Sequence, residues 1–340
     1  MTNMLGQDEL LKLIDRAMKG GIVDVDTLGD AVLQPTKLTR FIRKMQEATV
    51  ILPEARYFPM TSQIHEIDRI SFTGRVLDSG SDASGDHKDL STSDYAKPVT
   101  ATNTLTVHEF QAIVSLRDKA LRRNIEKDNF EQTLIDLLGE AVGRDMEEFA
   151  LFADKDFTYG QDHVLSKSNG WIKQSANAIY GVGGSKDFDP AGETYPENMF
   201  NAMLEGMPKE YLSNISSWRY WVNWEMENAY RDLLKKRGTA LGDTIYTTGG
   251  KLVYKGIPIE RVPVIERAQA TGEGGPGDVA ILGYPNNHIW GVFHKVTIER
   301  EREAKKRQTD FILTLEVDAG YEDENAVIVA YVDKETPSVS

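Results

Sequence analysis

Cysteine is absent from the 340 residues of the chain. Without thiols the protein has no disulfide, no thiolate zinc site and no cysteine nucleophile, and it suits a reducing cytoplasm. Long apolar runs are absent as well, since none approaches the ~20 residues that span a bilayer. The start of the chain is amphipathic and charged, without the apolar core of a signal peptide. We therefore expect neither a membrane span nor a secretion signal.

Positive charge is scarce. The chain has 39 Lys and Arg against 53 Asp and Glu, a formal net charge of −14. Because phosphate binding depends on clustered cations, nucleic-acid binding by the whole surface is disfavoured. The length and the 40% hydrophobic content are enough to bury a sizeable core in two or three domains.

Catalytic and metal-binding signatures are incomplete. Two His-Glu pairs, at 65–66 and 108–109, begin like a zinc-protease helix, but Arg69 and Ala112 stand where the second histidine belongs. Two Asp-rich segments begin like calcium loops but lack the bidentate Glu that closes such a loop. Neither a phosphate-binding glycine loop nor a Gly-x-Ser-x-Gly elbow is present. We expect no enzyme, no metal site and no cofactor.

The chain is organised around an apolar stripe in 124–154, whose spacing of three to four residues predicts an amphipathic helix. The stripe comprises Ile125, Phe130, Leu134, Leu137, Leu138, Ala141, Val142, Phe149 and Phe152. Gly139 and Gly143 each cost roughly 1 kcal/mol relative to Ala in a helix, which suggests close approach of a neighbouring backbone. Such a helix needs a large partner surface, and 292–331 is the best candidate.

Residues 64–107 predict a long β-hairpin. Polar and mostly apolar residues alternate from 69 to 76. The alternation returns after Pro98, where Thr100, Thr102, Thr104 and Thr106 share one side. The polar stretch 78–97 forms the tip. Since an isolated hairpin is marginal in water, this one should rest on its own body or on a neighbour.

Other segments give shorter elements. We expect short helices at 7–19 and 35–47, helices over 196–212 and 218–236, a strand–turn–strand over 251–265, and strands at 279–282, 289–299, 311–317 and 326–332. Trp218, Trp221 and Trp224 then lie on neighbouring helical turns. Tryptophan at this spacing is more often core or interface than a stacking platform for bases or sugars.

This order of parts resembles the major capsid protein of tailed bacteriophages, the HK97-type fold. The resemblance covers about residues 35–333. Its most specific sequence patterns are the Gly-x-Pro turn at 256–258, the segment 281–289, and the hairpin and closing strand over 296–327. It implies an α+β fold with an N-terminal arm, an extended loop, a spine helix, a peripheral domain and an axial domain. The implied ranges are 1–63 for the arm, 64–107 for the extended β-hairpin loop, 108–184 and 290–340 for the peripheral domain, and 185–289 for the axial domain.

The resemblance also implies the function and the partners. Copies of the subunit would form hexamers and pentamers of an icosahedral shell, assembled in the host cytoplasm and carried in the virion. A separate scaffold protein, a portal and decoration proteins are expected partners, and the packaged DNA is contacted weakly and without sequence specificity. An encapsulin-like compartment around a cargo enzyme is an alternative with the same fold. A soluble enzyme or ligand-binding protein is an alternative of another class.

Opposite charges on the two hairpin tips suggest the contact between subunits. We expect Asp86 and Asp89 to meet Arg302, Lys305 or Arg307 of another subunit. Exposed pairs contribute only ~0.2–1 kcal/mol each, but the contact repeats across a shell. Some members of the family also join a loop Lys to an Asn of a neighbour, and Lys88 or Lys97 with Asn325 are the candidates here.

Overall fold

A computed structural model describes the chain from residue 49 to residue 335 with several gaps. The described ranges are 49–72, 76–77, 79–81, 84, 87, 97–117, 130–156, 163–183, 186–236, 251–270 and 278–335. The helices expected at 7–19 and 35–47, most of the polar hairpin tip, and the beginning of the 124–154 helix lie outside the described residues.

A four-stranded sheet has the order β1-β10-β11-β4. Its strands are β1 (Arg56–Pro59), β10 (His288–Glu303), β11 (Gln308–Tyr321) and β4 (His108–Arg117). β1 runs parallel to β10, and the other pairs are antiparallel. β10 and β11 are longer than the sequence predicted, because pairing continues to Glu303 and Gln308 and leaves only a short turn.

A six-stranded sheet has the order β5-β12-β9-β6-β8-β7. Its strands are β5 (Asn177–Val182), β12 (Val327–Glu335), β9 (Val279–Gly283), β6 (Arg219–Val222), β8 (Ile257–Arg261) and β7 (Val253–Tyr254). The expected domain ranges counted 177–182 and 327–335 with the peripheral segments. Both strands instead pair in this sheet, β12 with β5 on one side and with β9 on the other.

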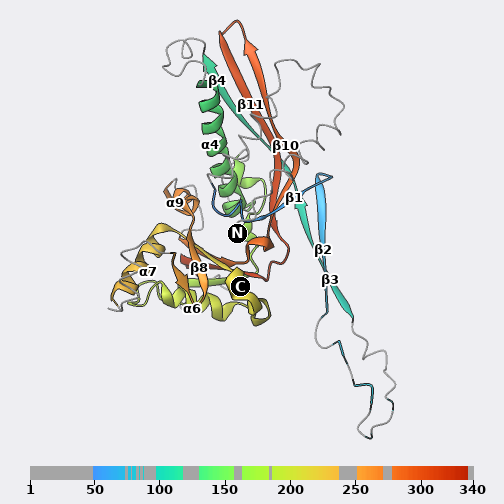
Figure 1. Cartoon of the computed structure of the whole chain (residues 1–340), viewed down its shortest axis with the longest axis vertical. Coiled ribbons are helices and arrows are strands. Elements are labelled where there is room, and N and C mark those ends of the chain that lie inside the picture. Colours follow the sequence, from blue (N-terminus) through green and yellow to red (C-terminus); the bar gives the residue numbers. More distant parts are fainter. Residues whose placement is uncertain are drawn as a thin grey trace.

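β2 (Ile64–Phe72) and β3 (Pro98–Thr106) form a separate two-stranded sheet. This hairpin stands away from the rest of the molecule, whereas β10, β11 and α4 (Phe130–Phe152) extend in the opposite direction (Figure 1). The molecule is therefore elongated, with one hairpin at each end.

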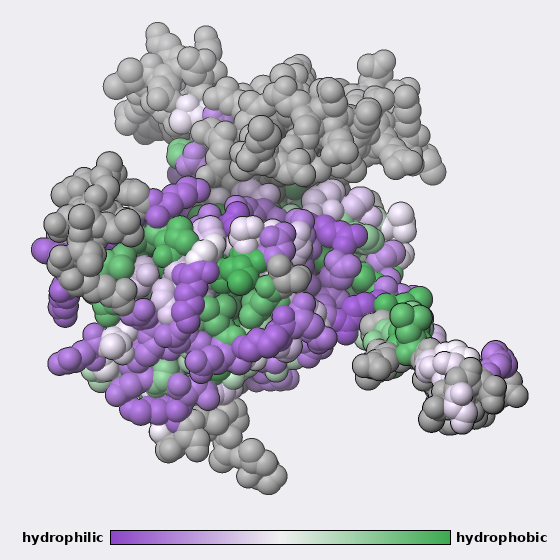
Figure 2. Space-filling model, turned by 60° about the horizontal axis from the view of Figure 1, so that its bottom comes forward, coloured by the Kyte–Doolittle hydropathy of each residue, from purple (hydrophilic) through white to green (hydrophobic). Residues whose placement is uncertain are grey.

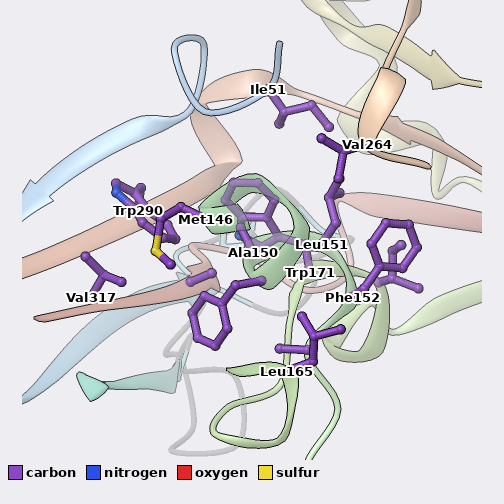
Figure 3. Close-up of a cluster of buried hydrophobic side chains, with 14 of the residues drawn as sticks. Ile51, Met146, Ala150, Leu151, Phe152, Leu165, Trp171, Val264, Trp290 and Val317 are labelled. Atoms are coloured by element: carbon purple, nitrogen blue, oxygen red, sulfur yellow. The ribbon is translucent and has the colours of Figure 1, made fainter. Parts of the chain in front are cut away.

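Helix α4 packs against the four-stranded sheet, as its apolar stripe predicted. The Phe149 ring lies 4.8 Å from the Phe110 ring of β4 and 6.5 Å from the Trp290 ring of β10, measured between centroids. Figure 3 shows this core around the helix, with Ile51 and Val264 on one side and Trp290 and Val317 on another. Leu137, which the stripe included, is instead 57% exposed, because the buried side of the helix runs through Ile135 and Val142.

The second core lies on the six-stranded sheet, where α6 (Glu197–Gly206) and α7 (Trp224–Lys236) pack. Its centre is aromatic: Phe200 lies within 4.7–5.7 Å of Tyr220, Tyr230 and Tyr254, measured between ring centroids. Short elements complete the two cores and connect the sheets: η3 (Val164–Ser166), α5 (Trp171–Gln174), η4 (Lys209–Ser217), η5 (Pro285–Asn287) and α9 (Pro263–Ala270).

Two predicted secondary-structure assignments in and beside the six-stranded sheet were wrong in part. The segment 218–236 is not one helix, because Arg219–Val222 is strand β6 and α7 begins only at Trp224. The strand–turn–strand over 251–265 holds through Arg261, where α9 follows in place of a continuing strand. The turn itself was predicted correctly, since Lys255 and Gly256 have positive φ values of 46° and 89° between β7 and β8.

Among the described residues, no helix has the length and apolarity needed to cross a membrane.

Candidate subunit interface

The projecting hairpin exposes three large apolar side chains on its outward face, among threonines and two carboxylates. Its register runs from Ile64 paired with Thr106 to Phe72 paired with Pro98. Because side chains alternate along a strand, Ile64, Ile70 and Phe72 share one face. They are 58%, 69% and 54% exposed, and the hairpin at the right of Figure 2 accordingly shows hydrophobic residues away from the main body. Apolar groups exposed on a projecting element are typical of a surface that a partner covers.

The opposite face of the hairpin is buried at its root. Leu105 of β3 is 2% exposed and packs where β10 and β11 carry glycines. A Cβ atom added at Gly320 would lie 2.6 Å from Leu105 Cδ2, and one added at Gly291 would lie 3.2 Å from Leu105 Cδ1. The two glycines therefore provide the space into which the root of the hairpin fits.

Hydrogen bonds from side chains continue this attachment. The Thr106 backbone N–H donates to Asp318 Oδ2 at 2.8 Å, and the Ser168 hydroxyl donates to Asp318 Oδ1 at 2.7 Å. The Asn103 side-chain amide donates to the Tyr321 carbonyl at 2.9 Å. Burial raises the pKa of Asp318, although the bonds from Ser168 and Thr106 lower it in part. The root of the hairpin is thus held by a buried, hydrogen-bonded carboxyl group.

We predict that Gly320→Ala destabilises the protein by about 1–3 kcal/mol, because the new methyl group overpacks against Leu105. Urea unfolding would measure this change, with Gly80→Ala as the control, since a Cβ there meets nothing within 4 Å. Adding Leu105→Ala to Gly320→Ala should cost less than Leu105→Ala alone in the natural background. Equal stability of Gly320→Ala and the natural protein would contradict the tight fit at the root.

The second hairpin ends in the basic tip expected from the sequence. The last ladder pair of β10 and β11 is Glu303 with Gln308. Arg302 lies at the end of β10, and Lys305 and Arg307 lie in the turn, all three exposed. Arg307 has φ of 51°. The three side chains are therefore presented together at one end of the molecule.

The acidic residues proposed to meet this tip, Asp86 and Asp89, lie outside the described residues. The tip also carries its own acidic partner, since Lys306 Nζ lies 2.9 Å from Glu303 Oε2. The described strands of the two hairpins extend in opposite directions (Figure 1), so a contact between these strands would join two subunits. The pairing of Asp86 and Asp89 with the basic tip stays a prediction.

Other residues considered from the sequence have structural places. The His-Glu pairs at 65–66 and 108–109 lie on strands β2 and β4, not on helices, and the described residues contain no cluster of His, Cys, Asp or Glu that could hold a metal ion. Trp218 and Trp221 are core residues, 4% and 0% exposed, while Trp224 is 50% exposed. The three tryptophans therefore do not form one stacking platform.

The proposed crosslink residues are only partly described. Lys97 and Asn325 are both exposed, and Lys88 lies outside the described residues. The Asn325 side-chain amide donates to Asp323 Oδ1 at 3.2 Å. That bond is within one chain, and the crosslink stays a prediction.

Sequence reasoning missed the residues at the root of the hairpin, namely Arg69, Asn103, Asp318 and Asp323. Asp318 offered no signal, because it continues the polar side of the alternation, after Thr314 and Glu316, and nothing in the sequence marks it as buried.

These features define a class of protein. The chain has the fold of phage capsid proteins, with solved capsid chains matching most of its length. It is similar to a chain of the satellite phage P4 procapsid that includes the size determination (Sid) protein, with a TM-score of 0.60, 14% identity, and coverage of 97% of this chain and 99% of that chain. It is similar to the capsid of an empty GTA particle, with a TM-score of 0.54, 14% identity, and coverage of 83% and 89%. Mycobacterium phage Che8 gives a TM-score of 0.54, 12% identity, and coverage of 83% and 90%.

A particular curated relative agrees in sequence. The chain is 29% identical over 299 residues to "Putative prophage capsid protein YqbE" of Bacillus subtilis (strain 168). The aligned region covers 87% of this chain and 91% of that protein. No family model matches the chain. The resemblance to tailed-phage major capsid proteins and the α+β capsid fold, both expected from the sequence, are confirmed.

Proposed function

We propose that this chain is the major capsid protein of a tailed phage or prophage, a structural subunit and not an enzyme. Copies would assemble as hexamers and pentamers into an icosahedral shell around double-stranded DNA. The observation that carries the proposal is the shape of the subunit: a hairpin with exposed apolar side chains projects from one end of a capsid fold. Many weak contacts of this kind act together when each subunit is held by several neighbours.

The proposal extends to partners and location. A separate scaffold protein, a portal and decoration proteins are expected, and the shell would be assembled in the host cytoplasm and persist in the virion. The net charge of −14 favours only weak contact with packaged DNA, without sequence specificity. We propose 1–63 as an arm, 64–107 as the extended loop, 108–184 with 290–340 as the peripheral domain, and 185–289 as the axial domain. This division assigns β5 and β12 to the peripheral domain, although both strands pair in the six-stranded sheet.

Negative-stain electron microscopy with sedimentation of the purified protein tests the function. We expect closed shells, tubes or capsomer rings, formed alone or after the candidate scaffold protein is added. A monomer or dimer that stays unassembled across salt concentrations, with and without that scaffold, would overturn the proposal. Shells isolated from cells should enclose DNA, while a protein cargo in its place would favour the compartment alternative.

The basic tip gives a specific prediction within this function. Arg302→Glu together with Arg307→Glu should lower the yield of shells about tenfold or more, because like charges then face the acidic partner. Sedimentation would measure the yield, and circular dichroism would check that the subunit folds.

The matched control is Arg144→Glu with Lys236→Glu, which makes the same change in net charge at exposed positions of α4 and α7. This control should assemble nearly as well as the natural protein. A charge-reversed tip that forms shells normally would exclude a role for the tip in assembly and would leave the capsid function in place.

A further inference from the structure

Asp323 connects three parts of the molecule. It lies in the turn between β11 and β12, where the chain passes from the four-stranded to the six-stranded sheet. Its carboxylate forms an ion pair with Arg69 of hairpin strand β2, and the Tyr211 hydroxyl of η4 donates to Asp323 Oδ2 at 2.7 Å. Its own backbone N–H donates to Asn287 Oδ1 at 2.8 Å. Asp323 thus contacts the hairpin and η4 through its side chain, and η5 through its backbone.

The hairpin needs such a connection because its backbone ladder to the body ends at its root. β4 pairs with β11 up to His108 and Val317. Beyond that point β3 separates from β11, and side chains replace the ladder: Asp318 accepts from the Thr106 N–H, and Asn103 donates to the Tyr321 carbonyl. Side-chain packing and side-chain bonds, and not strand pairing, therefore determine the direction in which the hairpin leaves the body.

The Arg69–Asp323 pair lies farther along the hairpin than the other attachments. In the register of β2 and β3, Arg69 is opposite Ala101, whereas Leu105 and Thr106 lie closer to β4. A bond farther from the pivot resists rotation more effectively than one beside it. The pair is also sheltered, with side-chain exposures of 31% for Arg69 and 12% for Asp323. The neighbouring Arg56–Glu322 pair is more exposed, with side-chain exposures of 47% and 48%. It attaches β1, and not the hairpin, to the same turn.

We propose that Arg69, held by Asp323, which in turn accepts a hydrogen bond from Tyr211, is a positioning residue that sets the angle of the hairpin before a second copy of the chain binds it. The inference rests on the proposed capsid function. A strand of nine residues spans roughly 30 Å, so a rotation of about 10° at the root moves its far end by about 5 Å. A hairpin already aimed at its neighbour avoids the cost of ordering on assembly.

The first experiment measures the hairpin angle in the unassembled subunit. Because the chain has no cysteine, Thr100→Cys on the hairpin and Glu205→Cys on α6 would carry two spin labels, both at exposed positions. We expect Arg69→Gln to broaden the distance distribution about twofold or more, and Tyr211→Phe to broaden it less. Arg56→Gln, which removes the other ion pair to the same turn, should leave it unchanged.

An unchanged distribution in Arg69→Gln, or equal broadening in Arg56→Gln, would overturn the proposal. If Arg69→Gln does not fold, Arg69→Lys and Tyr211→Phe provide the same comparison with smaller changes. The second experiment compares shells. Arg69→Gln should give shells of mixed size or open sheets where Arg56→Gln gives uniform shells. Because the distance measurement needs no assembly, failure of the positioning role is distinguishable from failure of the capsid function.

Discussion

Replacing Glu147 by Ala should lower the free energy of unfolding by about 2–4 kcal/mol. Glu147 is fully buried on α4, and its Oε1 accepts the backbone N–H groups of Val50, Ile51 and Leu52 at 2.8, 2.5 and 3.4 Å. Removing the carboxylate leaves these donors without their acceptor, which costs about 1–3 kcal/mol for a buried group. The space left by the side chain adds to the loss.

The effect should begin at the segment that precedes β1. Ile51 is fully buried and lies beside Val264 at one side of α4 (Figure 3). If Glu147 holds this segment, hydrogen exchange at residues 50–52 should accelerate in Glu147→Ala well before the rest of the molecule unfolds. Urea unfolding followed by tryptophan fluorescence would measure the global change.

Glu147→Gln is the matched control. The Gln carbonyl still accepts the three N–H groups, so most of the protection at residues 50–52 should remain. Burial raises the pKa of Glu147 despite those bonds, so the loss of a negative charge in the Gln variant removes an unfavourable burial and offsets part of the lost bond strength. Equal losses in the Ala and Gln variants would show that the carboxylate does not hold the segment through these bonds.

Local patterns predicted the elements whose burial is one-sided. The period of α4 follows from a stripe that faces one sheet, and the hairpin follows from the threonine alternation over 100–106. The pattern failed where both sides are buried. Tyr220, Trp221 and Val222 of β6 are all in the core, so the strand shows no alternation, and tryptophan spacing alone suggested a helix.

Apart from the packing of α4 on the segment 292–331, contacts between distant parts of the chain were not predicted. β12 follows β11 directly, and we expected both in the peripheral domain, yet β12 pairs with β5 and β9, which are distant in sequence. The same holds for the candidate interface. The sequence identified Arg302, Lys305 and Arg307 because a charged turn is a local feature, but Arg69 and Asp323 are more than two hundred residues apart and neither is unusual in its own segment.

His288 lies at the junction of the two sheets, in a pocket of aromatic rings. Its ring centroid lies 5.0 Å from that of Trp171 on α5, 4.8 Å from that of Trp221 on β6, and 4.9 Å from that of Tyr321 on β11. Its Nδ1 lies 3.1 Å from the Tyr284 carbonyl, which can only accept, so we assign the proton to Nδ1. Nε2 is buried and has no hydrogen-bond partner among the described residues.

This environment keeps the imidazole neutral. Burial lowers the pKa of His288 to about 4, although the bond to Tyr284 raises it slightly. A second proton would have to enter at Nε2, among rings that offer it no acceptor. Since the unfolded chain takes up this proton near pH 6.5, the contribution of His288 to stability is complete above that pH and is lost as the pH falls toward 4.

We therefore expect His288 to account for about 3 kcal/mol of the stability lost between pH 8 and pH 4, from a pKa difference of about 2.5 and roughly 1.4 kcal/mol per pKa unit. His288→Gln can still donate to the Tyr284 carbonyl and does not titrate, so its stability should fall by about 3 kcal/mol less over the same range. Carboxylates such as Glu266, whose pKa is lowered by Arg261, contribute equally to both proteins and cancel in the comparison.

Urea unfolding at the two pH values measures the difference, and the fluorescence of Trp171 and Trp221 reports the junction itself, because a protonated imidazole quenches a neighbouring indole. Parallel pH profiles for the natural protein and the Gln variant would mean that acid weakens the subunit elsewhere, and the junction between the sheets would then have to tolerate a charged His288.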